Sequence, residues 1–520
     1  MNVRQRLLKI ADRIVTLVLA SLLTGTTLAF GGAVWWARPM IAGLTSLLVI
    51  ASLARVALEG RMRVLKSPLT ALGALALALA AVQLSPLPPR VAEQLSPRSR
   101  AAYALGFFPE RARAAGPGLA LPEPAGGGSP VTLDRSGTLQ WLAGATACLA
   151  LFWSVSLFAD RLGRLYVVWG SIIAAFFFNT SFALVQLVSR SGHLFGLYDP
   201  GLGPWWTPSV GDLLATPNTT ALRALDAASA ATTSWAVPVP DRPFLIGSLM
   251  GGPGAFLALG TIGLPLALAL ILQLLAPRGS REGLRTRLGD SGQGGLVVLL
   301  MGLLLTSAVL IGLMAGRWLS LPFAISLVLV GLPSARPSGL RWLGLVVTLL
   351  SVLALGGGIL LGEVWSRIPD ARPLASAEGL ETATRVWADA WAILRDFPVL
   401  GTGLGSFASI FPLYKSCDEA RTTALSSLLQ WWVEAGAVGV ALLVVALLWC
   451  LYRLPGAVRR VGTADRALAF GMIGAAAGFG LFSAVHWTVE LAAVAVAASA
   501  LGGAGNRWLA GGTDLFVERG

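Results

Sequence analysis

The chain has 520 residues, of which 55% are hydrophobic and 12% are charged, and its mean hydropathy is +0.73. The charged residues, 39 basic and 26 acidic, are too few to cover several water-facing domains, so this composition excludes a soluble multidomain protein. The formal charge of +13 is typical of a membrane protein that keeps arginine in its cytoplasmic turns, an explanation that we favour over nucleic-acid binding.

Apolar runs of about 20 residues recur along the whole chain, and each is long enough to cross about 30 Å of hydrocarbon as a helix. We therefore predict an all-α, polytopic integral membrane protein with about twelve transmembrane helices. The expected spans are residues 14–36, 40–59, 68–86, 138–158, 165–189, 248–276, 294–315, 318–333, 342–362, 426–452, 467–485 and 488–505.

The distribution of basic residues predicts the orientation of these spans. Lysine and arginine gather before the first expected span and after each even-numbered span from the second to the tenth. Because these residues stay on the cytoplasmic side of short loops, both termini are predicted to be cytoplasmic. Three large loops, at about residues 87–137, 190–247 and 363–425, then lie on the outer side. Because binding and catalytic residues concentrate on loops, large outer loops and short inner turns suggest that the protein acts on the outer side.

The same pattern divides the chain into four parts. Residues 1–137 hold the first three spans and the first outer loop, and residues 138–362 hold spans four to nine with the second outer loop. Residues 363–425 form the third outer loop, which contains an amphipathic helix. Residues 426–520 hold the last three spans and a cytoplasmic tail.

The helix in the third outer loop is followed by a glycine-rich turn. Apolar side chains recur at helical spacing from Glu381, and Pro398 then ends the helix before Gly401, Gly403 and Gly405. Tryptophan and isoleucine on one face with charged residues on the other suit the lipid headgroup zone. A packing helix that stiffens the loop explains the same spacing equally well. The glycines are a weak phosphate-binding signal, since no strand precedes them and no P-loop lysine follows.

Two arginines, Arg317 and Arg385, are expected near the outer membrane surface. Arg317 lies between two apolar runs, in a tight hairpin, and Arg385 lies on the amphipathic helix. A guanidinium is always charged and its planar fork matches phosphate oxygens, so the two arginines would clamp a diphosphate. The alternative for Arg317 is that its side chain only reaches to the lipid headgroups.

The chain has two histidines, His193 in the second outer loop and His486 in the turn of the last hairpin. Glu490 lies one helical turn beyond His486, a spacing that lets the imidazole and the carboxylate form a hydrogen bond and tune each other. Ionisable groups at a membrane edge are candidates for function, although a turn at the interface also accommodates them at little cost. The three cysteines allow no disulfide framework and no metal cluster, so no metal or cofactor is expected.

Several motifs follow one another in the C-terminal half. The segment that begins at Arg385 reads RVWADAWAILRDFPVLGTGLGSF, and it is followed by Tyr414 and by a Leu-Gln…Glu-x-Gly-x-x-Gly pattern that contains Glu434. This order resembles the O-antigen ligase and polymerase family, multi-span enzymes that join glycans delivered on a polyprenyl diphosphate carrier. His486 with Glu490 is similar to the family's H-x-x-x-D, and Arg317 falls at its S-R-G-G arginine. Weaker matches lie at Thr132, Leu133, Asp134, Thr138, Gln186, Gly196, Leu197, Tyr198, Pro243 and Phe244.

The sequence departs from the family pattern at two places. Family members carry a His-Asn pair that is thought to help activate the acceptor hydroxyl, and here Leu425 and Ser426 stand in its place. The family's N-R-N-H, after a Pro-Phe pair, is replaced by LIGSLMGGPG. A base would then come from Glu419, Glu434 or the pair of His486 and Glu490. The pair is favoured, since Glu434 is better suited to packing or to capping a helix end.

The resemblance implies a glycan ligase or polymerase of the bacterial inner membrane. Its donor would be a polyprenyl-diphosphate-linked oligosaccharide or polysaccharide, and its acceptor a glycolipid, a glycan or a protein. Membrane lipid is a further expected partner, and nucleic acid is not. Arg317, Arg385 and Tyr414 would bind substrate, and His486, Glu490 and Glu434 are the candidate catalytic residues. A subunit that binds the lipid-linked glycan without turnover remains a second hypothesis, and a transporter or flippase is a third that is less favoured.

Overall fold

The computed structural model of the chain describes residues 3–32, 37–60, 67–104, 129–189, 252–275, 291–334, 341–366, 380–416, 423–462, 465–486 and 492–510. These residues form helices and turns, with one isolated bridge between Leu87 and Ser129 and no strand within the described ranges, which confirms the all-α prediction. The long helices are α1 (Val3–Leu28), α2 (Ala37–Glu59), α3 (Leu69–Leu84), α7 (Arg135–Phe158), α8 (Leu162–Ser189), α11 (Gly252–Leu275), α13 (Ser291–Leu319), α14 (Leu321–Ser334), α15 (Arg341–Ser366), α18 (Ser427–Arg459), α19 (Arg466–Val485) and α20 (Ala492–Leu509). The shorter elements are η1 (Phe30–Gly32), α4 (Pro89–Leu95), α5 (Pro97–Ala104), α16 (Leu380–Asp396), α17 (Phe407–Ile410) and η2 (Phe411–Leu413).

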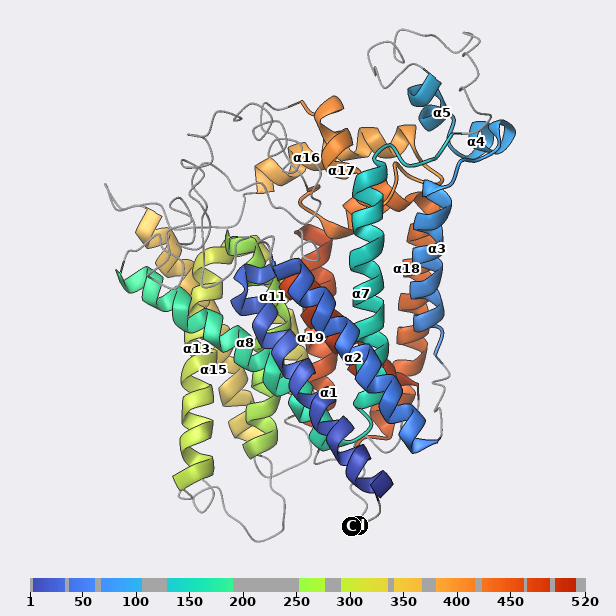
Figure 1. Cartoon of the computed structure of the whole chain (residues 1–520). Coiled ribbons are helices and arrows are strands. Elements are labelled where there is room, and N and C mark those ends of the chain that lie inside the picture. The colour runs from blue at the N-terminus through green and yellow to red at the C-terminus, as the bar shows by residue number, and fades with distance from the viewer. Residues whose placement is uncertain are drawn as a thin grey trace, which may run out of the picture.

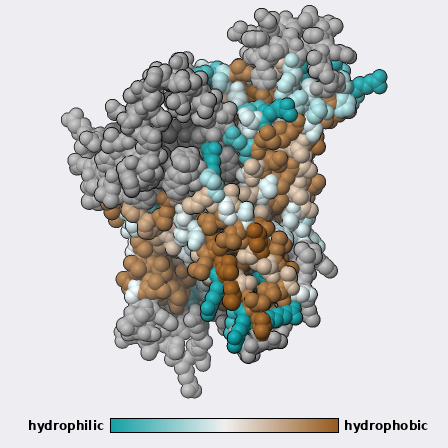
Figure 2. Space-filling view, viewed as in Figure 1, coloured by the Kyte–Doolittle hydropathy of each residue, from teal (hydrophilic) through white to brown (hydrophobic). Residues whose placement is uncertain are grey.

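Each expected span overlaps one helix, although the bounds differ, most of all for the first span, which overlaps α1. In the described part of the chain, eight of these helices are long and apolar enough to cross a membrane, namely α2, α7, α8, α11, α13, α15, α18 and α19. Helices α3 and α14 are apolar but shorter. Figure 2 shows hydrophobic side chains over the middle of one face of the bundle and hydrophilic side chains toward its two ends. The chain is therefore a helical multi-pass membrane protein, and the count of about twelve spans remains a prediction.

A buried ion-pair network joins four helices at one end of the bundle. The guanidinium of Arg55 on α2 is 5% exposed and lies 2.9 Å from Asp12, 2.8 Å from Glu59 and 3.1 Å from Asp160. Arg164 on α8 also pairs with Asp12 and Asp160. The start of α1, the end of α2 and the turn between α7 and α8 therefore meet here. We call this end of the bundle the basic end. The opposite end carries α16 and α17, and we call it the loop end (Figure 1).

Glycines let the helices approach closely in the core of the bundle. Helix α11 lies at the centre of this core, and nearly all of its span is buried. A Cβ atom at Gly312 of α13 would overlap the carbonyl oxygen of Leu355 on α15, and one at Gly358 of α15 would overlap that of Val309 on α13. Small residues at such contacts are what membrane helices use to pack.

Candidate functional site

A turn formed by residues 397–406, here called the glycine turn, follows α16 and pairs with a break in α18. Gly436 breaks α18 with a φ of 63°. The amide N–H of Thr402 donates to the carbonyl oxygen of Val433 at 3.0 Å, and the amide of Ala437 donates to that of Pro398 at 2.9 Å. Among the turn's own amides, those of Thr402, Gly403 and Gly405 are bound to oxygens of Val433 and Glu434, so the turn is a packing device and no phosphate cradle.

Gly401 shows why this turn needs glycine. Its φ is 70°, a left-handed value that residues with a Cβ atom rarely adopt. A Cβ atom there would also overlap the carbonyl oxygen of Glu434, and one at Gly436 would overlap that of Val399. The glycines at both places let the turn and the helix approach backbone to backbone.

Glu434 holds the glycine turn with its carboxylate. The side chain is 3% exposed, and its Oε2 accepts from the amide of Gly405 at 2.8 Å while its Oε1 accepts from the amide of Phe407 at 3.0 Å. The side chain of Gln430 donates to the same Oε1 at 3.3 Å. Both oxygens are thus used on the protein itself, which favours a positioning role. A catalytic role for Glu434 remains a prediction.

A buried glutamine, Gln83 near the end of α3, ties the same two segments together. Its Nε2 donates to the carbonyl oxygens of Leu400 and Glu434 at 2.7 and 2.9 Å. Its Oε1 accepts from the amide of Leu404 at 3.0 Å. Gln83 was not predicted from the sequence, where its one signal is a polar residue at the end of an otherwise apolar run.

The Thr-Leu-Asp segment at the start of α7 also packs against the glycine turn. The amide of Leu133 donates to the carbonyl oxygen of Thr402 at 2.9 Å. Asp134 caps α7 by accepting from the amide of Gly137 at 2.9 Å, and its other carboxylate oxygen accepts from the Ser409 hydroxyl at 2.5 Å. The first and third of the large loops predicted from the sequence are thereby joined at the loop end.

Thr132 lies inside this junction. Its hydroxyl is 2.6 Å from that of Thr138, and its carbonyl oxygen accepts from the Tyr103 hydroxyl at 2.6 Å. Burial raises the pKa of the Tyr103 phenol, so this group remains a donor at neutral pH. The upstream motif that was a weak match in sequence is therefore structural support for the glycine turn.

Helix α16 packs with its apolar face against the protein. Val386, Ala390 and Ile393 on this face are fully buried. On its polar side, Asp396 accepts a hydrogen bond from the Tyr414 hydroxyl at 2.7 Å. Asp389 accepts one from the amide N–H of Ser416 at 2.9 Å. The structure thus supports the packing interpretation of the amphipathic helix. Tyr414, predicted to bind substrate, contacts Asp396 in this arrangement, and its predicted role is untested.

The two predicted clamp arginines lie on elements that touch each other. Arg317 follows the break in α13 at Gly316, and the ring of Trp318 lies 6.4 Å from that of Trp387 on α16, two residues after Arg385. Figure 1 places α16 at the loop end. The hairpin that carries Arg317 and the helix that carries Arg385 are therefore neighbours at this end.

Each of these arginines is exposed and holds a carboxylate. Arg317 is 79% exposed and forms a bidentate pair with Glu363 on α15, with Nη2 2.8 Å from Oε2. Arg385 is 64% exposed, and its Nη2 lies 2.6 Å from Oε1 of Glu381. Exposed pairs of this kind contribute only about 0–1 kcal/mol. A ligand that brings more negative charge than a carboxylate can therefore replace either partner.

Residues 296–444 match the family model described as O-antigen ligase. This match supports an O-antigen ligase-like family for the chain. No curated protein matches it. The matched segment contains Arg317, Arg385, the glycine turn and Glu434, and within a multi-pass membrane protein it indicates glycan transfer of the O-antigen ligase or polymerase type. Such a family implies a lipid-linked glycan substrate and a glycan acceptor.

His486 lies beside the place where O-antigen ligases carry their His-Asn pair. The residue directly follows the end of α19, is 3% exposed, and stacks its ring on that of Phe482 with ring centroids 5.1 Å apart. Its carbonyl oxygen accepts from the amide of Ser427 at 3.4 Å, and the Ser426 hydroxyl donates to the carbonyl oxygen of Ala484 at 2.8 Å. The end of α19 is thus joined to the start of α18, directly after Leu425. His486 therefore lies next to the residues that follow Leu425, where this sequence departs from the family pattern.

Several predicted residues lie outside the described residues. These are Glu490, Glu419, His193, Gly196, Leu197, Tyr198, Pro243 and Phe244. The pairing of His486 with Glu490 therefore remains a prediction. Gln186, the other upstream match, is buried within α8.

Proposed function

We propose that this O-antigen ligase-like protein transfers a glycan from a polyprenyl diphosphate carrier to an acceptor hydroxyl at the outer face of the bacterial inner membrane. The observation that carries this proposal is a chain of aromatic contacts at the loop end. Trp387 contacts Trp318, Phe323 lies 5.8 Å from Phe482, and Phe482 stacks on His486. These contacts join the elements that bear Arg385, Arg317 and His486.

The arginines supply the electrostatic part of the reaction. The acceptor oxygen attacks the anomeric carbon of the donor sugar, the bond from that carbon to the diphosphate oxygen breaks, and the diphosphate leaves with the bonding electrons. Arg317 and Arg385 exchange Glu363 and Glu381 for phosphate oxygens and stabilise the charge that develops on the leaving group. Both guanidinium groups are accessible for this exchange because they are exposed.

His486 is the proposed general base. It takes the proton that the acceptor hydroxyl loses as the new glycosidic bond forms, a contribution of about 10² to 10⁴ in rate. The end of α19, which precedes His486, is hydrogen-bonded to the start of α18, next to the position of the family's own histidine. Glu490 is proposed to orient the imidazole, and Glu434 keeps the glycine turn in place.

The test is glycan transfer by the purified full chain with an authentic lipid-linked donor and acceptor. His486→Gln should reduce the transfer rate by about 10² or more while donor binding remains. His193→Gln, the matched change at the other histidine, should leave the rate unchanged. Normal transfer by His486→Gln would remove the base assignment.

A second candidate function is binding of the lipid-linked glycan without turnover. Leu425 favours it, because an apolar side chain stands where the family has its base. Tight donor binding by the wild-type protein, with no transfer to any acceptor and no change in the glycans of cells that lack the protein, would establish this alternative.

A further inference from the structure

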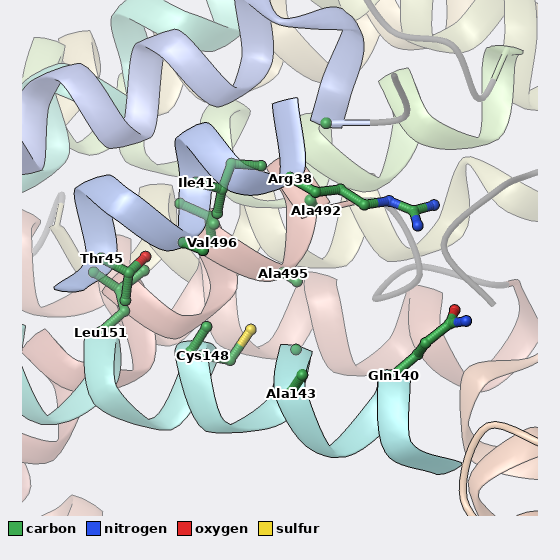
Figure 3. Close-up of a pocket in the computed structure, with 14 residues that line it drawn as sticks. Arg38, Ile41, Thr45, Gln140, Ala143, Cys148, Leu151, Ala492, Ala495 and Val496 are labelled. Atoms are coloured by element: carbon green, nitrogen blue, oxygen red, sulfur yellow. The ribbon is translucent and has the colours of Figure 1, made fainter. Parts of the chain in front are cut away.

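A groove between α2, α7 and α20 runs from the loop end into the bundle (Figure 3). It encloses a cavity of about 250 Å³. Its wall on α7 is a single helix face with small side chains, including Ala143, Gly144, Ala147 and Cys148, and Ala495 lies opposite on α20. An apolar groove lined by small residues accepts a hydrocarbon chain.

Two polar groups at the loop end of this groove have buried atoms without a partner. The Nε of Arg38, the second residue of α2, and the Oε1 of Gln140, in the second turn of α7, form no hydrogen bond with the described residues. Figure 3 shows both side chains at the same end of the groove. Buried polar atoms are almost always paired, so these two indicate a ligand that supplies the missing partners.

The electrostatics of this end favour an anion. Arg38, in the first turn of α2, provides a positive charge, and the groove is lined there by Ala492, the first residue of α20. Helix N-termini carry partial positive charge and unpaired amides, so those of α2 and α20 beside a guanidinium favour a phosphate. An apolar groove that ends in such a site fits a phosphate on a single hydrocarbon chain.

The polar end of the groove borders the candidate functional site. Gln140 lies one helical turn after Gly137, where a Cβ atom would overlap the carbonyl oxygen of Gly405 in the glycine turn. The ring of Trp141, the next residue, contacts that of Trp431 on α18 in a tilted arrangement, with ring centroids 5.9 Å apart. A ligand in the groove would therefore present its head group next to the elements that carry the proposed chemistry.

We propose that this groove binds the polyprenyl chain of the donor, with Arg38 on a phosphate oxygen and the carbonyl oxygen of Gln140 accepting from a sugar hydroxyl. This inference rests on the proposed function, because it takes the donor as the occupant. The donor satisfies all three features of the groove: one chain for the apolar wall, a phosphate for Arg38 and a hydroxyl donor for Gln140.

Cys148 offers a direct test, since it lines the groove and forms no disulfide. In the full chain with Cys417→Ser and Cys450→Ser, polyprenyl diphosphate in detergent micelles should suppress the reaction of Cys148 with an apolar maleimide. Polyprenol, which lacks phosphate, should protect less, and phosphatidylglycerol at the same mole fraction should not protect. Equal protection by phosphatidylglycerol would show a general lipid site, and labelling unaffected by the diphosphate would also overturn the proposal.

Variants extend the test to the donor itself. Arg38→Gln should weaken binding of the lipid-linked donor by roughly tenfold to hundredfold, the range for a lost charged hydrogen bond. The control Arg135→Gln changes an exposed arginine of α7 that does not line the groove and should have no effect. Ala147→Leu should fill the groove and weaken binding, whereas Thr146→Leu adds the same side chain on an exposed face of α7 and should not.

The outcomes separate this inference from the proposed function. Normal transfer with unchanged donor affinity in Arg38→Gln and Ala147→Leu would overturn the groove and leave the transferase standing. Protection of Cys148 that depends on Arg38, in a protein that never transfers glycan, would confirm the groove and overturn the transferase.

Discussion

Arg317 and Arg385 differ from ordinary surface arginines in what surrounds them. Each has a carboxylate partner on a neighbouring turn or helix, and each is more than half exposed. The carboxylates hold the guanidinium groups in place. Because these ion pairs are exposed, a phosphate can replace the carboxylate at a low cost in free energy. Sequence reasoning identified both arginines, whereas Glu363 as the partner of Arg317 was visible only in the structure.

Replacing these arginines by lysine tests the clamp. Arg317→Lys and Arg385→Lys keep the charge and lose the bidentate fork, so each should weaken donor binding by roughly tenfold at unchanged membrane levels. Donor affinity and transfer rate are the measurements. Arg98→Lys, a matched change of another exposed arginine at the loop end, should leave both unchanged. Full donor affinity in both variants would contradict the clamp and would indicate that the arginines only anchor the protein at the membrane interface.

Leu425 carries backbone strain at the position of the family's histidine. Its φ is 53°, the only positive φ of a non-glycine residue among those described. The left-handed region costs about 1–2 kcal/mol for a residue with a Cβ atom. Histidine is found in this region several times more often than apolar residues are.

This strain makes Leu425→His an informative variant. We expect the protein to reach normal membrane levels, because histidine accepts the backbone, and to transfer glycan faster than wild type. In a His486→Gln background the same change should restore part of the lost rate. Leu425→Met, a control of similar size, should change neither. No gain of rate in either background would mean that position 425 does not face the acceptor.

At the scale of elements, the glycine turn is held by α3, the start of α7 and α18. Gln83, Leu133 and Glu434 each form hydrogen bonds with its backbone. The family motif from Arg385 to Gly439 is therefore largely the description of one packed junction. We infer that this junction fixes the position of α16, which carries Arg385.

Glu434→Gln distinguishes positioning from catalysis. The glutamine side chain has one acceptor oxygen, but two backbone N–H groups point at this position. One buried N–H group would therefore lose its partner, which lowers the free energy of unfolding by about 1–3 kcal/mol. We expect a lower unfolding temperature in detergent and a fall in transfer that follows it. The matched change Glu381→Gln, on an exposed carboxylate, should leave the unfolding temperature unchanged. Loss of transfer at full stability would instead identify Glu434 as a base.

At the scale of the whole molecule, the helices alternate in direction between the two ends of the bundle. The network around Arg55 gathers α1, α2, α7 and α8 at the basic end, and Gln273 at the end of α11 lies 3.1 Å from Asp465 at the start of α19. The opposite ends of α3, α18 and α19 reach the glycine turn and His486. This alternation is what the distribution of basic residues predicts for a multi-pass protein.

Cysteine reporters test which end faces outward. In a cysteine-free chain, single cysteines at positions 115, 220 and 375 should react with an impermeant thiol reagent added to intact cells. A cysteine at position 283 should react only after the membrane is opened, because basic turns stay inside. Labelling of position 283 with protection of position 375 would reverse the orientation and contradict a reaction at the outer face.

The sequence alone predicted the helices and the positions of the two arginines that we propose as a diphosphate clamp. A long apolar run forms a helix in a membrane because its backbone has no other hydrogen-bond partner there, and this holds without knowledge of its neighbours. The arginines were identified because a charge at a membrane edge is conspicuous. The helix Leu380–Asp396 followed from its apolar spacing.

The partner of each apolar or polar face became visible only in the packed structure. The spacing in α16 suits a membrane surface as well as a protein surface, and the burial of Val386 and Ile393 was needed to choose between them. The glycines were ambiguous for the same reason, until the amides of Gly403 and Gly405 were found on the carbonyl and carboxylate oxygens of Glu434. Gln83 and the Arg38 groove depend on segments far apart in the chain, and such pairings leave no local pattern because they are set by packing between helices.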